Sequence, residues 1–305
     1  MTWLSGVVRK QGKILLENKW YAMLHAVSLA LLPYTAWLSV AIVALVTLRK
    51  GWRNGGWLLA PVIAANIALS MASTTAVIAF VNALLMFAPS YLAAVVLRMT
   101  TSWRAVAGVF FLQVVVAVSL LQLFMPDFIM AQYLYLQSVL REGQIESALL
   151  TFINDKAGVN QLILANYLLG LQAVGVVFSA CIPLMLSRSV QSQLFYPGGF
   201  RHEMLLFRGD KMGFLLLITL LMAASQHSLL AIGLLPLLIF YFLLAGLSLS
   251  FNLFAKQKPR YSVALLVAPL FLLPFIMLPV YVIFGSLDSL FNFRLYLSSD
   301  AGKTI

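Results

Sequence analysis

The chain has 305 residues, of which 62% are apolar and only 10% are charged. Soluble globular proteins carry about 25% charged and about 45–50% apolar residues, so this composition excludes a soluble protein. The 20 lysine and arginine residues outnumber the 9 acidic ones, but they lie between apolar stretches. That distribution is typical of the positive-inside rule, and we expect membrane lipid rather than nucleic acid as a partner.

The apolar stretches predict an all-α fold, namely a polytopic transmembrane helical bundle. A spanning helix needs about 20 apolar residues, and clear stretches of this kind run over 56–73, 76–97, 105–125, 159–186, 212–228 and 229–253. Two further apolar regions, 21–48 and 262–285, contain prolines, which interrupt helical hydrogen bonding. We expect short, proline-broken hairpins there, the first turning near Pro33, and about eight crossings in all.

Charges in the connecting segments predict the topology. Most cations lie in segments that we therefore expect to face the cytoplasm, together with the N-terminus: 1–20, 49–55, 98–104, 187–211 and 254–260. The segment 126–158 carries more acidic than basic residues and is expected to be extracytoplasmic. Its apolar residues Ile145, Leu149, Phe152 and Ile153 share one helical face, which suits either a solvated connector or a lid over an outward cavity.

The predicted organisation has three parts. Residues 1–20 combine cations with tryptophan and aliphatic residues and are expected to form an interfacial amphipathic helix on the cytoplasmic side. Residues 21–285 form the transmembrane bundle. Residues 286–305 form a short interfacial C-terminal tail, and the charges leave its membrane side open.

Catalytic motifs are absent from the sequence. The histidines His25, His202 and His227 are not at metal-ligand spacing, and the single cysteine, Cys181, lies in an apolar run. No zinc-protease, serine-hydrolase or nucleotide-binding motif occurs. No acidic residue falls in the middle of a clear span, which argues against a proton-driven pump. We therefore expect no enzyme, no metal and no cofactor.

Polar side chains inside the predicted spans are the candidates for ligand recognition. Each amide is expensive to bury alone and must meet another helix, water or a ligand. Gln122 and the other amides either form interhelical hydrogen bonds or line one pocket with neighbouring threonines. The candidate ligand-binding residues are Asn66, Thr74, Thr75, Asn82, Gln113, Asn166 and Gln172.

A face of small residues marks the first helix of the predicted bundle. Ala22, Ala26 and Ala30 follow one another at four-residue spacing, which lets another helix approach closely. The approaching helix belongs either to the same chain or to a partner, such as a second copy.

The C-terminal quarter carries a family resemblance. The sequence GSLDSLFNFR, with Gly285, Asp288, Phe291, Phe293 and Arg294, resembles the C-terminal end of the YybS-like family of bacterial membrane proteins. The segment from Ile182-Pro183 through Ser187-Arg188 resembles the middle of the same family. The resemblance implies a multi-pass protein of the bacterial cytoplasmic (inner) membrane. The family is in turn similar in layout to the substrate-binding S-components of energy-coupling-factor vitamin transporters, which use such an alanine face to dock a coupling subunit.

Two residues of this ending have separate expected roles. Asp288 and Arg294 are six residues apart and do not stack on one helical face. We expect Arg294 to meet lipid phosphate, and Asp288 to cap a helix or to pair with a cation of a cytoplasmic loop.

Two functional hypotheses follow from these patterns. In the first, the protein is a binding or transport component for a small apolar molecule or a lipid, because amides and broken hairpins lie inside its spans. In the second, it is a non-transporting scaffold that recruits partners through its basic cytoplasmic face, which includes Arg201, Arg208 and Lys211.

Overall fold

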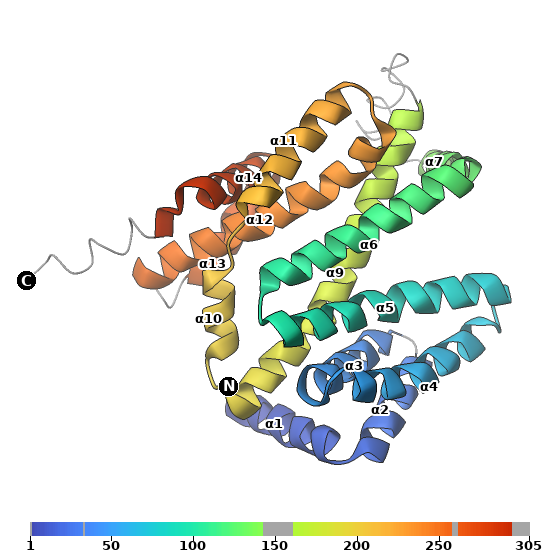
Figure 1. The fold of residues 1–305 in the computed structure, drawn as a ribbon, viewed down its shortest axis with the longest axis vertical. Coiled ribbons are helices and arrows are strands. Elements are labelled where there is room, and N and C mark those ends of the chain that lie inside the picture. Colours follow the sequence, from blue (N-terminus) through green and yellow to red (C-terminus); the bar gives the residue numbers. More distant parts are fainter. Residues whose placement is uncertain (1, 33, 143–160, 258–261, 295–305) are drawn as a thin grey trace, which may run out of the picture. The chain divides into compact units, whose positions relative to one another are not determined.

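The computed structural model describes residues 2–32, 34–142, 161–257 and 262–294, and within these ranges it contains helices and turns but no strand (Figure 1). The predicted all-α class is confirmed. The chain divides into two compact units. Unit 1 comprises Met1–Phe110 and Gly175–Phe207, and unit 2 comprises Phe111–Val174 and Arg208–Ile305.

Five described helices are long and apolar enough to cross a membrane. They are α5 (Ala76–Thr100), α6 (Trp103–Phe124), α9 (Gln161–Phe195), α12 (Leu229–Gln257) and α14 (Pro274–Phe291). A further apolar helix, α11 (Lys211–Ser225), is shorter. These lengths agree with a multi-pass membrane protein, whereas the predicted count of about eight crossings is not confirmed.

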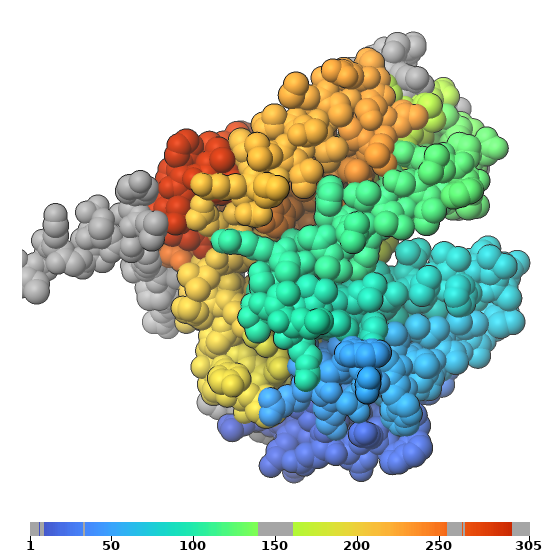
Figure 2. Space-filling view, viewed as in Figure 1, coloured from blue at the N-terminus to red at the C-terminus, as the bar shows by residue number. Residues whose placement is uncertain are grey.

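Unit 1 is built around a central helix. Its remaining helices are α1 (Thr2–Glu17), α2 (Lys19–Leu31), α3 (Ala36–Lys50), α4 (Trp52–Ser70) and α10 (Gly199–Leu206). Every residue of α3 from Ser39 to Leu48 is buried, because α2, α4 and α5 pack around it. A helix that is apolar on all sides is stable either inside a protein core or in lipid, and here neighbouring helices of unit 1 surround it. In the space-filling view, the dark blue atoms of α1 and α2 lie directly against the lighter blue atoms of α3 and α4 (Figure 2).

The predicted hairpin over 21–48 is confirmed as two short helices, α2 and α3, with the break between Leu31 and Ala36. The predicted N-terminal helix is also present, but α1 ends at Glu17. Asn18 ends it because its side chain accepts hydrogen bonds from the backbone N–H groups of Trp20 and Tyr21, at 3.0 and 3.2 Å, and so caps the start of α2.

Buried serines tie the helices of unit 1 together. Ser39 donates to the carbonyl oxygen of Ala26 at 2.7 Å, and Ser90 on α5 donates to that of Ala180 on α9, also at 2.7 Å. Each hydroxyl reaches the backbone of a different helix, so these bonds fix how the helices are rotated about their own axes. Hydroxyl groups buried in this way need a partner, since leaving one unbonded in an apolar interior is costly.

Unit 2 contains the C-terminal helices and the second proline-broken hairpin. Its other described helices are α7 (Pro126–Glu142) and α13 (Ser262–Leu272). The chain breaks at Leu273, directly before Pro274, and the Tyr281 hydroxyl donates to the Leu266 carbonyl oxygen at 3.0 Å. These two residues lie about equally far from the break, so α13 folds back along α14. The broken helix predicted for 262–285 is therefore confirmed.

Two predicted segments are only partly described. Helix α7 covers the first half of 126–158, while the stretch from Ile145 to Ile153 lies outside the described residues. The predicted tail begins inside α14, which continues to Phe291, and residues 295–305 also lie outside the described ranges.

Candidate functional site

The predicted polar residues of unit 1 lie on the α4–α5 hairpin. Asn66 on α4 is half-buried, whereas Thr74 and Thr75 in the turn and Asn82 on α5 are exposed. The exposed three therefore face the surroundings of unit 1 rather than its interior.

In unit 2 the structure brings two amides together. Asn166 on α9 is 1% exposed, and its Oδ1 accepts a hydrogen bond of 2.7 Å from Gln122 Nε2 on α6. Its Nδ2 donates to the Leu162 carbonyl oxygen at 2.8 Å. Gln172 is exposed, and the buried Gln113 Nε2 has no hydrogen-bond partner among the described residues. Asn166 and Gln122 thus follow the first of the two interpretations, an interhelical hydrogen bond.

We expect Asn166→Leu to lower the stability of the detergent-purified protein by about 1 kcal/mol, because Gln122 then loses its partner between α6 and α9. The change is measured as a shift in melting temperature. The matched control is Gln172→Leu, which alters an exposed amide on the same helix and is expected to leave the melting temperature unchanged. Equal shifts in the two variants would contradict the structural role of the pair.

The small-residue face of α2 is covered by the chain itself. Ala22, Ala26 and Ala30 are 2%, 0% and 1% exposed and belong to a core cluster with residues of α3 and α4. A partner that docks on these alanines would have to displace helices of unit 1. Docking on this face stays a prediction.

The C-terminal motif forms an ion pair that the helical spacing did not predict. Helix α14 ends at Phe291, and Asn292 adopts a left-handed conformation with φ of 50° that turns the chain. Arg294 thereby returns to Asp288, with Nε 3.1 Å from Oδ2, and the Asp288 side chain is fully buried. Arg294 also donates to the Ser248 hydroxyl at 3.3 Å. The expectation that Arg294 meets lipid phosphate is thus corrected by the turn at Asn292, which aims its guanidinium at Asp288.

A second arginine closes the end of α14. Arg208 Nε donates to the Asp288 carbonyl oxygen and Nη2 to that of Ser289, both at 2.8 Å. A cation at the last carbonyls of a helix is favourable, because the negative end of the helix dipole lies there. The end of α14 therefore lies beside the segment that begins at Arg208, which the loop charges predict to be cytoplasmic.

The carboxylate of Glu203 holds α10 in place in unit 1, because it accepts hydrogen bonds from side chains of α6 and α9. Trp103 Nε1 at the start of α6 donates to Glu203 Oε2 at 2.9 Å, and Arg188 of α9 donates from Nε at 3.1 and 3.2 Å and again from Nη2. Burial raises the pKa of Glu203, but the hydrogen bonds from Arg188 and Trp103 and the charge of Arg188 lower it more. The net pKa lies below the ordinary value of 4.5.

This network predicts a pH dependence. A carboxylate whose pKa is lower in the folded protein contributes stability that is present above its ordinary pKa and is lost as the pH falls through the folded value. We expect Glu203→Gln to lower the melting temperature by a few degrees at about pH 7 and to have a shrinking effect below about pH 4.5. Melting curves of both proteins across this range check it. A difference that stays constant with pH would contradict the assignment.

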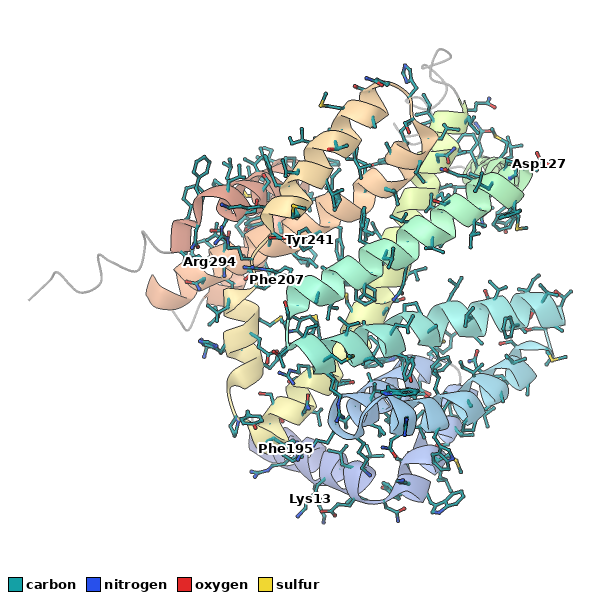
Figure 3. The ribbon with its side chains drawn as sticks, viewed as in Figure 1. Lys13, Asp127, Phe195, Phe207, Tyr241 and Arg294 are labelled. Carbon is teal, nitrogen blue, oxygen red and sulfur yellow. The ribbon has the colours of Figure 1, made fainter. Side chains whose placement is uncertain are left out.

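One described cavity of unit 1 is basic. It has a volume of about 820 Å³ and lies between α1, the end of α3 and the end of α9. Its cations are Arg9, Lys10, Lys13, Arg49 and Lys50, its single carboxylate is Glu17, and its apolar residues include Leu16, Leu194 and Phe195. Figure 3 labels Lys13 and Phe195 on its walls. We call it the basic cavity.

Packing and electrostatics define the walls of the basic cavity. Helix α1 lies close to α9 at Gly12, where a Cβ atom would come within 2.8 Å of Val190 Cγ1. The Arg49 guanidinium lies 3.9 Å from the centre of the Phe195 ring, a cation–π contact that holds it in place. Glu17 is 3.7 Å from Lys13, and both side chains are mostly exposed. Four further cations line the cavity without a carboxylate in its walls to balance them.

The sequence contains a partial signal for this site. Arg9, Lys10 and Lys13 fall on one predicted helix, and Arg49 and Lys50 follow the end of another. Their spacing predicts topology and an interfacial helix, but not a shared site. Nothing in their spacing indicates that α1 and the end of α3 meet. Among the described residues, no group of three His, Cys, Asp or Glu is placed to hold a metal ion.

Comparison of the chain with protein-family models, curated proteins and solved structures gives no match. The resemblance to the YybS-like family stays an expectation.

Proposed function

We propose that this multi-pass membrane protein is a binding component for an anionic membrane lipid, whose phosphate headgroup occupies the basic cavity of unit 1. The observation that carries the proposal is the set of five cations and one carboxylate that line a cavity of about 820 Å³. Ligand cavities commonly measure about 300–1,000 Å³, so the space suits a headgroup. The sequence alone predicts a small apolar molecule or a lipid as the ligand, and the charge of the cavity narrows this prediction to anionic lipids.

The charge of the cavity favours a phosphate. Cations that share a cavity repel one another unless an anion lies between them, and this repulsion strengthens as water is excluded. Arginine guanidinium groups bind phosphate oxygens in pairs, and lysine ammonium groups act as point charges toward them. Arg49 is already oriented by Phe195 and loses little freedom on binding. The cavity therefore suits a phosphate better than an uncharged ligand.

The exposed tryptophans of α2 and α4, and the location of the cavity's walls, favour a lipid over a soluble anion. Trp20, Trp52 and Trp57 are 68%, 59% and 48% exposed, and the rings of Trp20 and Trp57 meet edge to face at 5.7 Å. Exposed tryptophans are enriched at the level of lipid headgroups. The three wall segments of the cavity also fall in regions that the loop charges assign to the cytoplasmic face, where anionic lipids gather.

Native mass spectrometry of the protein in mild detergent tests the proposal, together with identification of bound lipid. We expect one anionic phospholipid to be retained in a fixed ratio. Each of Arg9→Gln, Lys10→Gln and Arg49→Gln should weaken retention about fivefold, since a cation near a membrane phosphate contributes roughly 1 kcal/mol. The control Lys211→Gln removes an exposed cation outside the cavity and should have no effect.

Two outcomes would overturn the proposal: a protein that carries only bulk lipid, or retention that is as sensitive to Lys211→Gln as to Arg49→Gln. Either would favour the alternative, a scaffold that recruits partners through basic segments. Arg201 and Lys211 are exposed and suit that role, whereas Arg208 is bonded to the end of α14. Partner association should then fall when Arg201 and Lys211 are neutralised together.

A further inference from the structure

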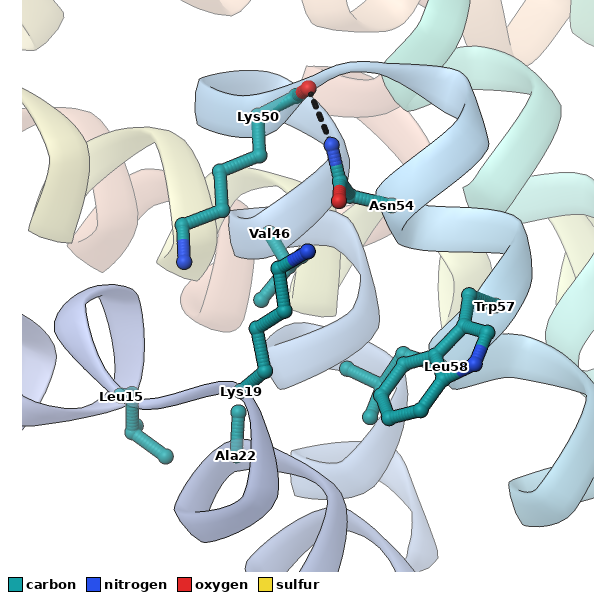
Figure 4. Close-up of a pocket in the computed structure, with 8 residues that line it drawn as sticks. All are labelled: Leu15, Lys19, Ala22, Val46, Lys50, Asn54, Trp57 and Leu58. Carbon is teal, nitrogen blue, oxygen red and sulfur yellow. Dashed lines mark hydrogen bonds between the residues drawn. The ribbon is translucent and has the colours of Figure 1, made fainter.

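A second, smaller cavity adjoins the basic cavity and shares one residue with it. Its walls are formed by Leu15, Lys19, Ala22, Val46, Lys50, Asn54, Trp57 and Leu58 (Figure 4). Lys50 also lines the basic cavity. Its volume is about 10 Å³, which is space for one water-sized group, such as a single oxygen of a phosphate.

The small cavity is also cationic. Lys19 at the start of α2 and Lys50 at the end of α3 both contribute to it, and no acidic residue is among its wall residues. Figure 4 shows the two lysine side chains extending into the space between these helix ends. Asn54 is fixed beside them, because its Nδ2 donates to the Lys50 carbonyl oxygen at 2.9 Å. Trp57, which is 48% exposed, also lines this cavity.

The shared lysine divides the cationic surface into two adjoining sites. Arg9, Lys10, Lys13 and Arg49 lie on the side of the larger space, and Lys19 lies on the side of the smaller one. A ligand with one phosphate satisfies the larger site and leaves Lys19 without an anion. A diphosphate likewise occupies only the larger site, because its two phosphates are adjacent, and it too leaves Lys19 without an anion.

We propose that the ligand of unit 1 is a phospholipid with two separate phosphate groups, one in the basic cavity and one against Lys19, with Lys50 between them. Cardiolipin is the common membrane lipid of this chemistry, and basic pockets between membrane helices suit its headgroup. This inference rests on the proposed function and adds the lipid class.

The test measures selection between lipids in nanodiscs. Wild-type protein is placed in nanodiscs that contain phosphatidylglycerol and cardiolipin in amounts that supply equal phosphate, and the bound lipid is counted by native mass spectrometry. We expect cardiolipin to be enriched. Lys19→Gln should reduce this preference about fivefold while phosphatidylglycerol binding remains, because only the second phosphate loses its cation. Arg9→Gln should weaken the binding of both lipids, and Lys211→Gln should change neither.

The outcomes separate this inference from the proposed function. Phosphatidylglycerol retained in a fixed ratio without preference for cardiolipin would overturn the two-phosphate ligand and leave the anionic-lipid site standing. A preference for cardiolipin that Lys19→Gln leaves intact would also overturn the two-phosphate ligand. Selective retention of an added polyprenyl diphosphate over cardiolipin would do the same. Absence of any retained anionic lipid would overturn both.

Discussion

Gly285→Ala is expected to destabilise unit 2 strongly, because α12 and α14 cross there with their backbones in contact. A Cβ atom at position 285 would lie 2.1 Å from the Phe242 carbonyl oxygen and 2.6 Å from the Gly246 nitrogen. Both are backbone atoms of α12 and cannot rotate away, so the helices must separate. Overpacking of this kind costs about 1–3 kcal/mol even where side chains can adjust. We expect the upper end of that range or more.

The same crossing predicts the effect of the facing glycine. A Cβ at Gly246 would come within 1.8 Å of the Tyr281 carbonyl oxygen, so Gly246→Ala should match Gly285→Ala. Close approach of two membrane helices depends on such small residues at the point of contact. The measurement is the melting temperature in detergent, together with the fraction of protein that elutes as a single species.

Two other helical glycines provide controls with the opposite sign. A Cβ added at Gly108 on α6 or at Gly175 on α9 meets no atom within 4 Å. Alanine at such a position stabilises a helix by about 0.5–1 kcal/mol, because the unfolded chain has less freedom to lose. If all four alanine variants shifted the melting temperature alike, α12 and α14 would not be in backbone contact.

The helices were predictable because they depend on local sequence, whereas their mutual contacts were not. Apolar length and proline position predicted the α2–α3 pair and the break before Pro274. The depth to which α3 is buried was not visible, because a helix that is apolar on all sides is equally consistent with exposure to lipid. Gly246 and Gly285 are likewise far apart in sequence, and no spacing rule pairs them.

The candidate site shows the same limit. The residue type identified Asn166 and Gln122 as side chains that need partners, and the structure pairs them. Residue type alone did not indicate that Asn82 and Gln172 are exposed, because exposure depends on how each helix is rotated against its neighbours. The basic cavity could not be predicted from the sequence for a further reason. Its walls come from three segments that only tertiary packing brings together.

Arg294→Leu is the second change with a large expected effect. Asp288 is fully buried, and its Oδ1 has no hydrogen-bond partner among the described residues, so the ion pair to Arg294 is its main stabilising contact. Removing one partner of a buried pair costs about 3–5 kcal/mol, because an uncompensated charge stays in a medium of low polarity. We expect a large fall in melting temperature, measured in detergent at neutral pH.

The matched control is an ion pair of the same charge type at the surface. Lys13 and Glu17 lie 3.7 Å apart with side chains that are 70% and 64% exposed. Such pairs contribute little, since water already solvates both ions. Glu17→Gln should therefore leave the melting temperature nearly unchanged, which separates the effect of burial from that of the ion pair itself.

A double variant decides whether the pair or the arginine alone is responsible. Asp288→Leu combined with Arg294→Leu removes both buried charges, and replacing a buried ion pair by apolar residues is often neutral or stabilising. We expect the double variant to be more stable than Arg294→Leu alone, a non-additivity that independent sites do not show. Strict additivity would mean that Arg294 acts through Ser248 and not through Asp288. In that case the turn at Asn292 would serve to anchor the chain to α12 rather than to neutralise the carboxylate at the end of α14.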